Sequence, residues 1–252
     1  MTLHRFFIDQ DLITENLEIT LPEEISHQIT QVLRLKNNEN LILLDNTGFE
    51  YLVNITDLHK KHTICEIIEK RKNENEPETK VHLFMALIAR DNFELTLQKS
   101  VELGISQITP ILTERTQFDR KFAESKYERW QKIMKEAAEQ SERGIIPQIN
   151  PILNFDFALK QAKENGFSLI AWEKEPTTHS VTTILQRHPQ PHRGSALKKP
   201  HEILNIFIGP EGGFTEQEIE QAKKENVKPV SLGKTILRAE TAAIATIAKI
   251  LL

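Results

Sequence analysis

The stretch NIFIGPEGGF, residues 205–214, joins four residues typical of a buried strand to a loop with three glycines. Thr215 and Glu218 follow at the spacing of a capping box, which predicts that a helix begins here. Glycines let the backbone turn sharply and bring its N–H groups close to a ligand. A strand, a glycine loop and a helix in this order predict a ligand-binding loop. A simple tight turn is an equally good explanation of the glycines alone.

The loop differs from the two common phosphate-binding motifs. It lacks the Lys-Ser/Thr pair of a Walker loop and the GxGxxG spacing of a dinucleotide site. An enzyme of another class that holds a nucleotide phosphate in this loop is therefore the weaker alternative.

A second stretch, SLGKTILRAETA at residues 231–242, has the same character. A short strand is expected to end at Gly233 and an alanine-rich helix to begin near Glu240. Arg238 and Glu240 then lie at a strand-to-helix junction, where functional groups often occur. The alternative is that Arg238 and Glu240 form a structural ion pair.

Outward from these loops, strand-like and helical patterns alternate through the last two thirds of the chain. Such alternation predicts an α/β fold with a parallel sheet covered on both faces, and ligands bind such sheets at the carboxyl ends of the strands. A stripe at residues 130, 133, 134, 137, 138 and 141 predicts the buried face of one helix. The expected strands are 81–88, 108–112, 169–172, 203–208 and 230–232, and the expected helices are 93–103, 127–142, 216–225 and 240–252.

The first 75 residues predict a separate, β-rich unit. One helix at 22–35 interrupts short strands at 6–8, 17–21, 41–44, 51–55 and 63–68. The polar stretch 69–80 reads as a linker, so we expect domains at 1–73 and 74–252. Residues 188–201 contain three prolines and predict a surface loop.

Composition restricts the class of protein. Of 252 residues, 39% are apolar and 27% charged, with a mean hydropathy of −0.40, which is typical of soluble globular proteins. No apolar run has the length of a membrane span and the start does not resemble a secretion signal, so we expect a cytosolic protein. The single cysteine, Cys65, excludes an internal disulfide and predicts a small core residue.

The charge balance excludes a general positive field. The net charge is −4, and the first 75 residues hold 8 basic and 13 acidic side chains. A polyanionic partner would therefore have to bind local clusters of Lys and Arg.

Several strings together resemble one family. They are GPEGGF, LGKTILRAETA, LQKSVELGISQITPILTERT, ERWQKIMKEAAEQSERGIIPQI and HQITQVLRLKNNENLILLD. In this order, and over nearly the whole chain, they closely resemble the bacterial 16S ribosomal RNA uridine-N3 methyltransferases of the SPOUT superfamily.

The resemblance implies a PUA-like β-barrel that helps to hold RNA, followed by a SPOUT-type α/β domain with a C-terminal trefoil knot. It implies S-adenosylmethionine as cofactor, no metal, and a homodimer in which the apolar last helix, 242–252, lies at the interface. The implied substrate is 16S rRNA, and we expect an assembled small subunit to be a better substrate than a free oligonucleotide. The implied cofactor-binding residues are Gly209, Pro210, Glu211, Gly212, Gly213, Leu232, Gly233, Ile236 and Leu237.

For catalysis, Arg238 is the first choice for stabilising negative charge on the base, and Glu240 and Glu211 are weaker candidates for a base or orienting group. The alternative is a non-catalytic RNA-binding or ribosome-assembly protein of the same fold. The expected RNA-contacting residues are Arg5, Arg34, Lys36, Arg115, Arg120, Lys121, Arg129 and Arg143.

The sequence departs from the family pattern at three positions. Ala89 and Asn92 stand where a Lys and an Arg are expected, with Arg90 next to them, and Thr235 stands where many relatives have Arg.

Overall fold

A computed structural model describes residues 3–13, 17–187 and 203–252, so the loop predicted at 188–201 lies outside the described residues. The chain divides into two compact units. The first unit comprises the residues up to Glu76 together with Lys135–Ile146, and the second comprises Pro77–Met134 and Pro147–Leu252.

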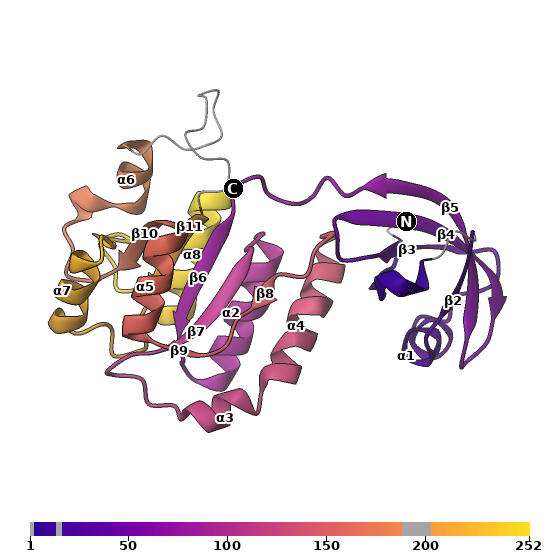
Figure 1. Ribbon diagram of the computed structural model, residues 1–252, viewed down its shortest axis with the longest axis horizontal. Coiled ribbons are helices and arrows are strands. Elements are labelled where there is room, and N and C mark those ends of the chain that lie inside the picture. The colour runs from indigo at the N-terminus through magenta and orange to yellow at the C-terminus, as the bar shows by residue number, and fades with distance from the viewer. Residues whose placement is uncertain (1–2, 14–16, 188–202) are drawn as a thin grey trace. The chain divides into compact units, whose positions relative to one another are not determined.

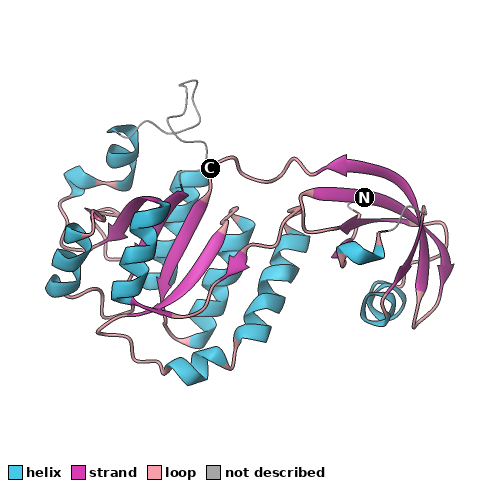
Figure 2. Cartoon of the chain, in the orientation of Figure 1, coloured by secondary structure: helices cyan, strands magenta, loops and turns pink. Residues whose placement is uncertain are grey.

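The first unit is a curled sheet of five strands in the order β1-β3-β4-β5-β2 (Figures 1 and 2). β1 pairs with β3 in parallel, and the other pairs are antiparallel. Cys65 is fully buried in its core, which confirms that prediction. The strands are β1 (Arg5–Phe7), β2 (Glu18–Leu21), β3 (Asn40–Leu44), β4 (Phe49–Leu58) and β5 (Thr63–Lys72).

Two elements of the first unit differ from expectation. The helix predicted from residue 22 is α1 (Glu23–His27), with Pro22 extended at its N-cap, and a π-helix (Gln28–Leu33) continues it. β5 runs on to Lys72, so the predicted linker is wrong for residues 69–72. Polar residues form a strand there because β4 supplies backbone partners as far as the Phe49–Lys72 pair, while their side chains remain exposed.

The second unit contains a seven-stranded sheet in the order β12-β10-β11-β6-β7-β8, with β9 also paired to β7. Every pair in it is parallel, as the alternating pattern predicted. The strands are β6 (Val81–Ala86), β7 (Gln107–Leu112), β8 (Gln148–Ile149), β9 (Leu153–Asn154), β10 (Gly166–Ala171), β11 (Ile203–Ile208) and β12 (Lys228–Val230).

Helices cover both faces of this sheet. Phe84, Ile170 and Phe207 pack with α5 (Phe155–Asn165) and α7 (Glu216–Lys224) on one face. α8 (Ala239–Leu251) packs on β6 and β11, and α2 (Arg90–Glu102) packs on α8; Figure 1 shows α5 and α8 on opposite faces. α3 (Arg120–Glu124), α4 (Tyr127–Gln140) and α6 (Val181–Arg187) complete the helices of the described ranges. Sequence periodicity did not predict α3, α5 or α6.

The pairing order fixes where a site can form. β10 lies between β11 and β12, so the carboxyl ends of these three parallel strands meet at one edge of the sheet. The predicted glycine loop follows β11, and the segment 231–238 follows β12. Within the described residues, no helix has the length and apolar content needed to cross a membrane.

Candidate functional site

The carboxyl ends of β10, β11 and β12 open into one cavity of about 600 Å³. Its lining includes the residues that follow each strand, 171–173, 208–214 and 231–240, with Asn92 from α2 and Ala242 from α8. Every predicted cofactor-binding residue and both predicted catalytic residues therefore line the same cavity. The sequence identified the two loops separately, and the strand order brings them together.

Two glycines in the loop after β11 leave little room for a side chain. Gly213 has a φ of 68°, and a Cβ there would lie 3.3 Å from the Glu173 carboxylate. A Cβ on Gly209 would lie 3.1 Å from the Phe214 ring. Gly213 also donates its N–H to the Pro210 carbonyl at 2.9 Å, which closes a turn. The loop is thus both a tight turn and a cavity wall, which unites the two explanations of its glycines.

Two side-chain hydrogen bonds join this loop to the segments that follow β6 and β7. Oε1 of Glu211 accepts a hydrogen bond from the Ala89 backbone N–H at 2.9 Å, at the start of α2. Nη1 of Arg115, beyond β7, donates to the Gly212 carbonyl at 2.6 Å. The Glu211 carboxylate therefore binds the backbone at the start of α2. Arg115, which the sequence predicted to contact RNA, anchors the glycine loop.

The helix after the loop begins as predicted. The Thr215 hydroxyl accepts from the Glu218 N–H at 3.2 Å, and the Glu218 carboxylate accepts from the Thr215 N–H at 2.8 Å, so the capping box is present. The same carboxylate accepts from the Glu114 N–H at 2.9 Å. Glu218 thus fixes the start of α7 against the segment that follows β7.

The segment after β12 is largely open to solvent. Ser231 pairs with Ser180, and the Gly233 N–H donates to the Ser231 hydroxyl at 3.3 Å. Beyond it, the Ile236 side chain is 86% exposed. Arg238 is the exposed N-cap of α8.

Two buried polar atoms in the cavity lining have no hydrogen-bond partner among the described residues. They are Oε2 of Glu240, a residue only 7% exposed, and Nε1 of Trp172. The alternative of an Arg238–Glu240 ion pair is not observed in the described part of the chain, where the salt bridges involve other residues. One acceptor and one donor are therefore left for a polar ligand.

Comparison with known proteins assigns the chain. A family model described as an RNA methyltransferase domain matches residues 74–251, and one described as an RNA methyltransferase PUA domain matches residues 21–68. The protein named ribosomal RNA small subunit methyltransferase E in Mesomycoplasma hyopneumoniae is 35% identical, over 98% of both chains. Its namesake in Rickettsia conorii is 36% identical, over 99% of this chain and 96% of that one. The chain belongs to this family.

A solved member of the methyltransferase E family has the same fold. The crystal structure of the Neisseria gonorrhoeae protein bound to S-adenosyl methionine has a TM-score of 0.84 and 31% identity, and the match covers 99% of this chain and 97% of that one. The family resemblance read from the sequence strings is thus confirmed, as is the order of a PUA-like unit before a SPOUT-type α/β unit.

In this structure, the predicted RNA-contacting residues occupy different environments. Arg143 is buried and forms a 2.7 Å ion pair with Glu76, and Arg5 pairs with Glu142 at 2.9 Å. Both ion pairs lie inside the first unit. These two arginines are better placed to join segments of that unit than to contact phosphate.

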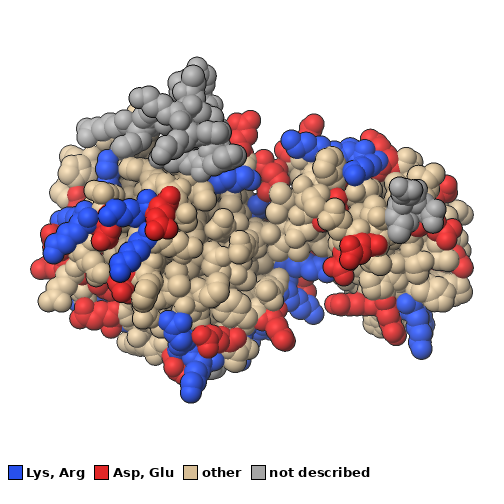
Figure 3. Space-filling view, viewed as in Figure 1, with Lys and Arg blue, Asp and Glu red and all other residues tan. Residues whose placement is uncertain are grey.

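The remaining basic candidates are more accessible. Arg129 donates two hydrogen bonds to Glu94, at 2.7 and 2.8 Å, and these bonds lower the pKa of Glu94 to about 2. Arg120 donates to the Ile152 carbonyl, and Arg34, Lys36 and Lys121 are exposed. On the face shown in Figure 3, basic and acidic side chains are interspersed. RNA contact by these residues stays a prediction.

Sequence reasoning missed Trp172 and Glu173 as lining residues. The strand predicted at 169–172 could have indicated them, because the carboxyl ends of neighbouring parallel strands lie at the same edge of a sheet. No group of three or more His, Cys, Asp or Glu side chains in the described ranges could hold a metal ion.

Proposed function

We propose that this chain transfers a methyl group from S-adenosylmethionine to ribosomal RNA of the small subunit, at N3 of a uridine in 16S rRNA. The observation that supports it is the single cavity lined by both sequence loops, in a family with a member crystallised with S-adenosyl methionine. The base and the atom modified rest on the family resemblance alone.

The cavity residues fit this cofactor. S-adenosylmethionine has cationic sulfonium and ammonium groups, which suit the unpartnered carboxylate oxygen of Glu240. Its carboxylate and its adenine accept hydrogen bonds, and Nε1 of Trp172, which has no partner within the described structure, can donate one. The glycine loop lines the same cavity. Residues 209–213, 232–233 and 236–237 would hold it.

Bound there, S-adenosylmethionine would supply an electrophilic methyl group. The proton on N3 of uracil has to leave as the new carbon–nitrogen bond forms, and negative charge develops on the base oxygens. Arg238 is exposed at the cavity and permanently charged, so it can stabilise that charge without a proton transfer of its own. Glu240 can accept the proton or orient the base.

Other parts of the proposal follow from the resemblance. The chain would act in the cytosol as a homodimer, with α8 at the interface and a trefoil knot around the cavity, on RNA within the small subunit. Domains at 1–73 and 74–252 would divide RNA binding from catalysis.

Two measurements test the function. Calorimetry with S-adenosylmethionine should show binding, and small subunits from cells that lack this protein should accept a methyl group that mass spectrometry locates on N3 of one uridine. RNA binding without cofactor binding would instead support the non-catalytic RNA-binding protein. Methylation of another atom would retain the enzyme and reject the uridine-N3 assignment.

Replacing Arg238 tests the mechanism. Arg238→Ala should lower the rate of methyl transfer by about 100-fold or more, the usual cost of a lost charge-stabilising group. Cofactor affinity should stay within about twofold, because the proposed role of Arg238 concerns charge on the base. Arg238→Lys serves as the control that keeps the charge. A normal rate in Arg238→Ala would remove this residue from the mechanism.

A further inference from the structure

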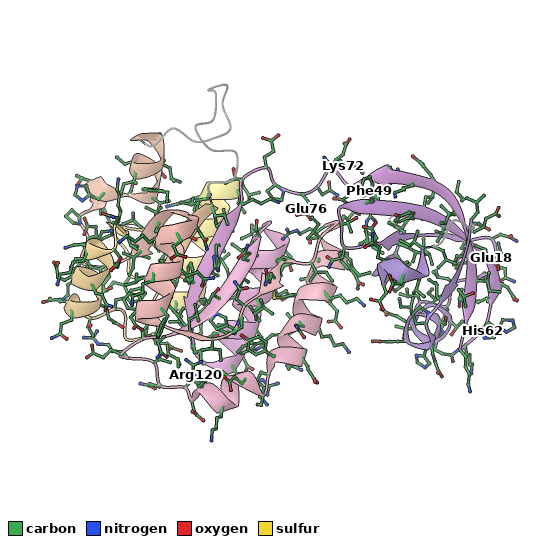
Figure 4. The ribbon with its side chains drawn as sticks, viewed as in Figure 1. Glu18, Phe49, His62, Lys72, Glu76 and Arg120 are labelled. Atoms are coloured by element: carbon green, nitrogen blue, oxygen red, sulfur yellow. The ribbon has the colours of Figure 1, made fainter. Side chains whose placement is uncertain are left out.

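The paired ends of β4 and β5 in the first unit carry two aromatic rings and two lysines on one face. Phe49 pairs with Lys72 and Tyr51 with Lys70, and residues two apart on a strand share a face. Figure 4 shows Phe49 and Lys72 together at this end of the strands. We call Phe49, Tyr51, Lys70 and Lys72 the aromatic–lysine rim.

A β-bulge produces this arrangement. The register shifts between Leu52 and Val53, where Ile68 is the additional residue of β5. The shift places Lys70 and Lys72 on the face of Tyr51, whose ring closes the core of the unit. Glu50 and Arg71 lie on the other face, joined by a 2.6 Å ion pair. The charges of the rim itself are therefore both positive.

The two rings have different roles. Tyr51 is only 4% exposed, and its hydroxyl donates to Asp45 at 3.1 Å, so it belongs to the core. Phe49 is 39% exposed, so part of its ring is accessible to a ligand. Nζ of Lys70 lies 4.7 Å from the Phe49 ring centroid and 5.2 Å from that of Tyr51.

An exposed ring flanked by cations matches single-stranded nucleic acid. Every base has a flat face that stacks on an aromatic ring, and lysines bind the phosphates on either side. Lys70 can leave the Phe49 ring for a phosphate at small cost, since a cation–π contact exposed to water is weak. A protein partner with a large apolar surface is a poorer match, because a single exposed ring is the main apolar feature of the rim.

We propose that the aromatic–lysine rim binds a single-stranded segment of the RNA substrate, with one base stacked on Phe49 and neighbouring phosphates held by Lys70 and Lys72. The proposal rests on the proposed function, because it takes ribosomal RNA as the substrate. It adds a contact surface outside the cavity and outside the basic residues that the sequence indicated.

The lysines are tested by the salt dependence of binding. For the full chain and a 16S rRNA transcript, Lys70→Ala/Lys72→Ala should reduce the slope of log affinity against log salt by about 1.4, or about 0.7 for each lost phosphate contact on a single strand. Lys60→Ala/Lys61→Ala is the matched control, since it removes the same charge from the exposed loop between β4 and β5. An equal reduction in the control would overturn the proposal.

The ring is tested separately. Phe49→Ala should weaken binding by about 10-fold, in the range measured for one lost stacking contact, and Phe49→Trp should retain wild-type affinity. Thermal unfolding of each variant checks that the first unit is intact. Wild-type affinity in Phe49→Ala, or loss in Phe49→Trp with an unchanged melting temperature, would overturn base stacking.

Measuring methyl transfer in the same samples separates this proposal from the proposed function. Variants that bind and react like wild type would reject the rim and leave the enzyme in place. Rim-dependent RNA binding by a wild-type chain that transfers no methyl group would retain the rim and reject the enzyme.

Discussion

At the scale of single residues, the most informative atom is Oε2 of Glu240, buried at the cavity without a hydrogen-bond partner in the described structure. A buried, unpartnered carboxylate oxygen is costly to folding, which favours a role with a ligand. Glu240→Gln keeps the shape and removes the ability to accept the N3 proton.

We expect Glu240→Gln to slow methyl transfer by about 10² to 10⁴-fold, the usual contribution of a general base, without lowering stability. Single-turnover kinetics at saturating cofactor would measure this rate, and urea unfolding would measure stability. An unchanged single-turnover rate would assign proton removal to water or another group.

Burial of His82 should make the free energy of unfolding depend on pH. It is fully buried, with Nε2 2.7 Å from the Thr109 hydroxyl, and burial lowers its pKa from 6.5 to about 4. The unfolded chain therefore takes up a proton on His82 at a higher pH than the folded chain. Stability should fall as pH decreases from about 6.5 to 4, by up to about 3 kcal/mol from this group.

Urea unfolding at several pH values would measure that loss. His82→Gln, which cannot be protonated and can still hydrogen-bond Thr109, should show a flatter profile over the same interval. A parallel profile in this variant would mean that other groups cause the acid sensitivity.

Single residues also show what sequence could not reveal. The glycines, Arg238 and Glu240 were found because each lies in a short string with its own local pattern. The hydrogen bond from Arg115 to the Gly212 carbonyl could not be predicted, because the two residues lie 97 positions apart in sequence. Trp172 was missed because a strand-ending tryptophan looks like core until its neighbours in the sheet are known.

At the scale of elements, the glycine loop makes a prediction about backbone conformation. Gly213→Ala forces a side chain onto a positive φ and toward Glu173, so it should cost about 1 kcal/mol of stability or more and weaken cofactor binding. Gly212→Ala is the matched control, because its φ is not positive and its new Cβ would meet only the flexible Arg115 side chain.

Calorimetry and thermal unfolding of the two variants would make the comparison. Equal effects at both positions would show that loop crowding, rather than left-handed backbone, is what matters.

Elements were predicted well where one residue pattern dominated. The parallel strands have continuous apolar runs, and the capping box marks α7. The sequence predicted too early an end for β5 because its last residues are polar, although the backbone of β4 pairs with them. α5 was missed although its buried residues, Phe155, Ala158, Leu159 and Ala162, follow helical spacing. Two of the four are alanines, which give a weak apolar signal.

At the scale of the whole molecule, the first unit is assembled from separate parts of the sequence. Glu76 accepts hydrogen bonds from Arg143 and from the backbone of Gly144 and Ile145, and Asn73 donates to the Glu142 carbonyl. The Phe7 N–H donates to Glu139. The sequence predicted two domains in simple succession, and periodicity carries no information about such a return of the chain.

Arg143→Ala should therefore destabilise the first unit by about 3 kcal/mol, because it leaves the Glu76 carboxylate without its charged partner. Arg71→Ala is the control from the same unit. Arg71 is half exposed, and Asn73 also hydrogen-bonds Glu50, so its loss should cost about 1 kcal/mol or less. Hydrogen exchange of the strands would locate the effect, and equal costs would contradict the structural assignment of Arg143.

The first unit contains residues from two separate parts of the sequence, so it cannot be completed until the second part has been translated. A ribosome that has translated Glu76 must add 70 further residues before Ile146 is in the chain. At a translation rate of about 5–20 residues per second, the sheet of the first unit lacks its last segment for roughly 4 to 14 seconds. During that interval residues 135–146 are absent, and Asn73, Glu76 and the Phe7 amide lack their native hydrogen-bond partners in that segment. The strands made first then depend on pairing with one another.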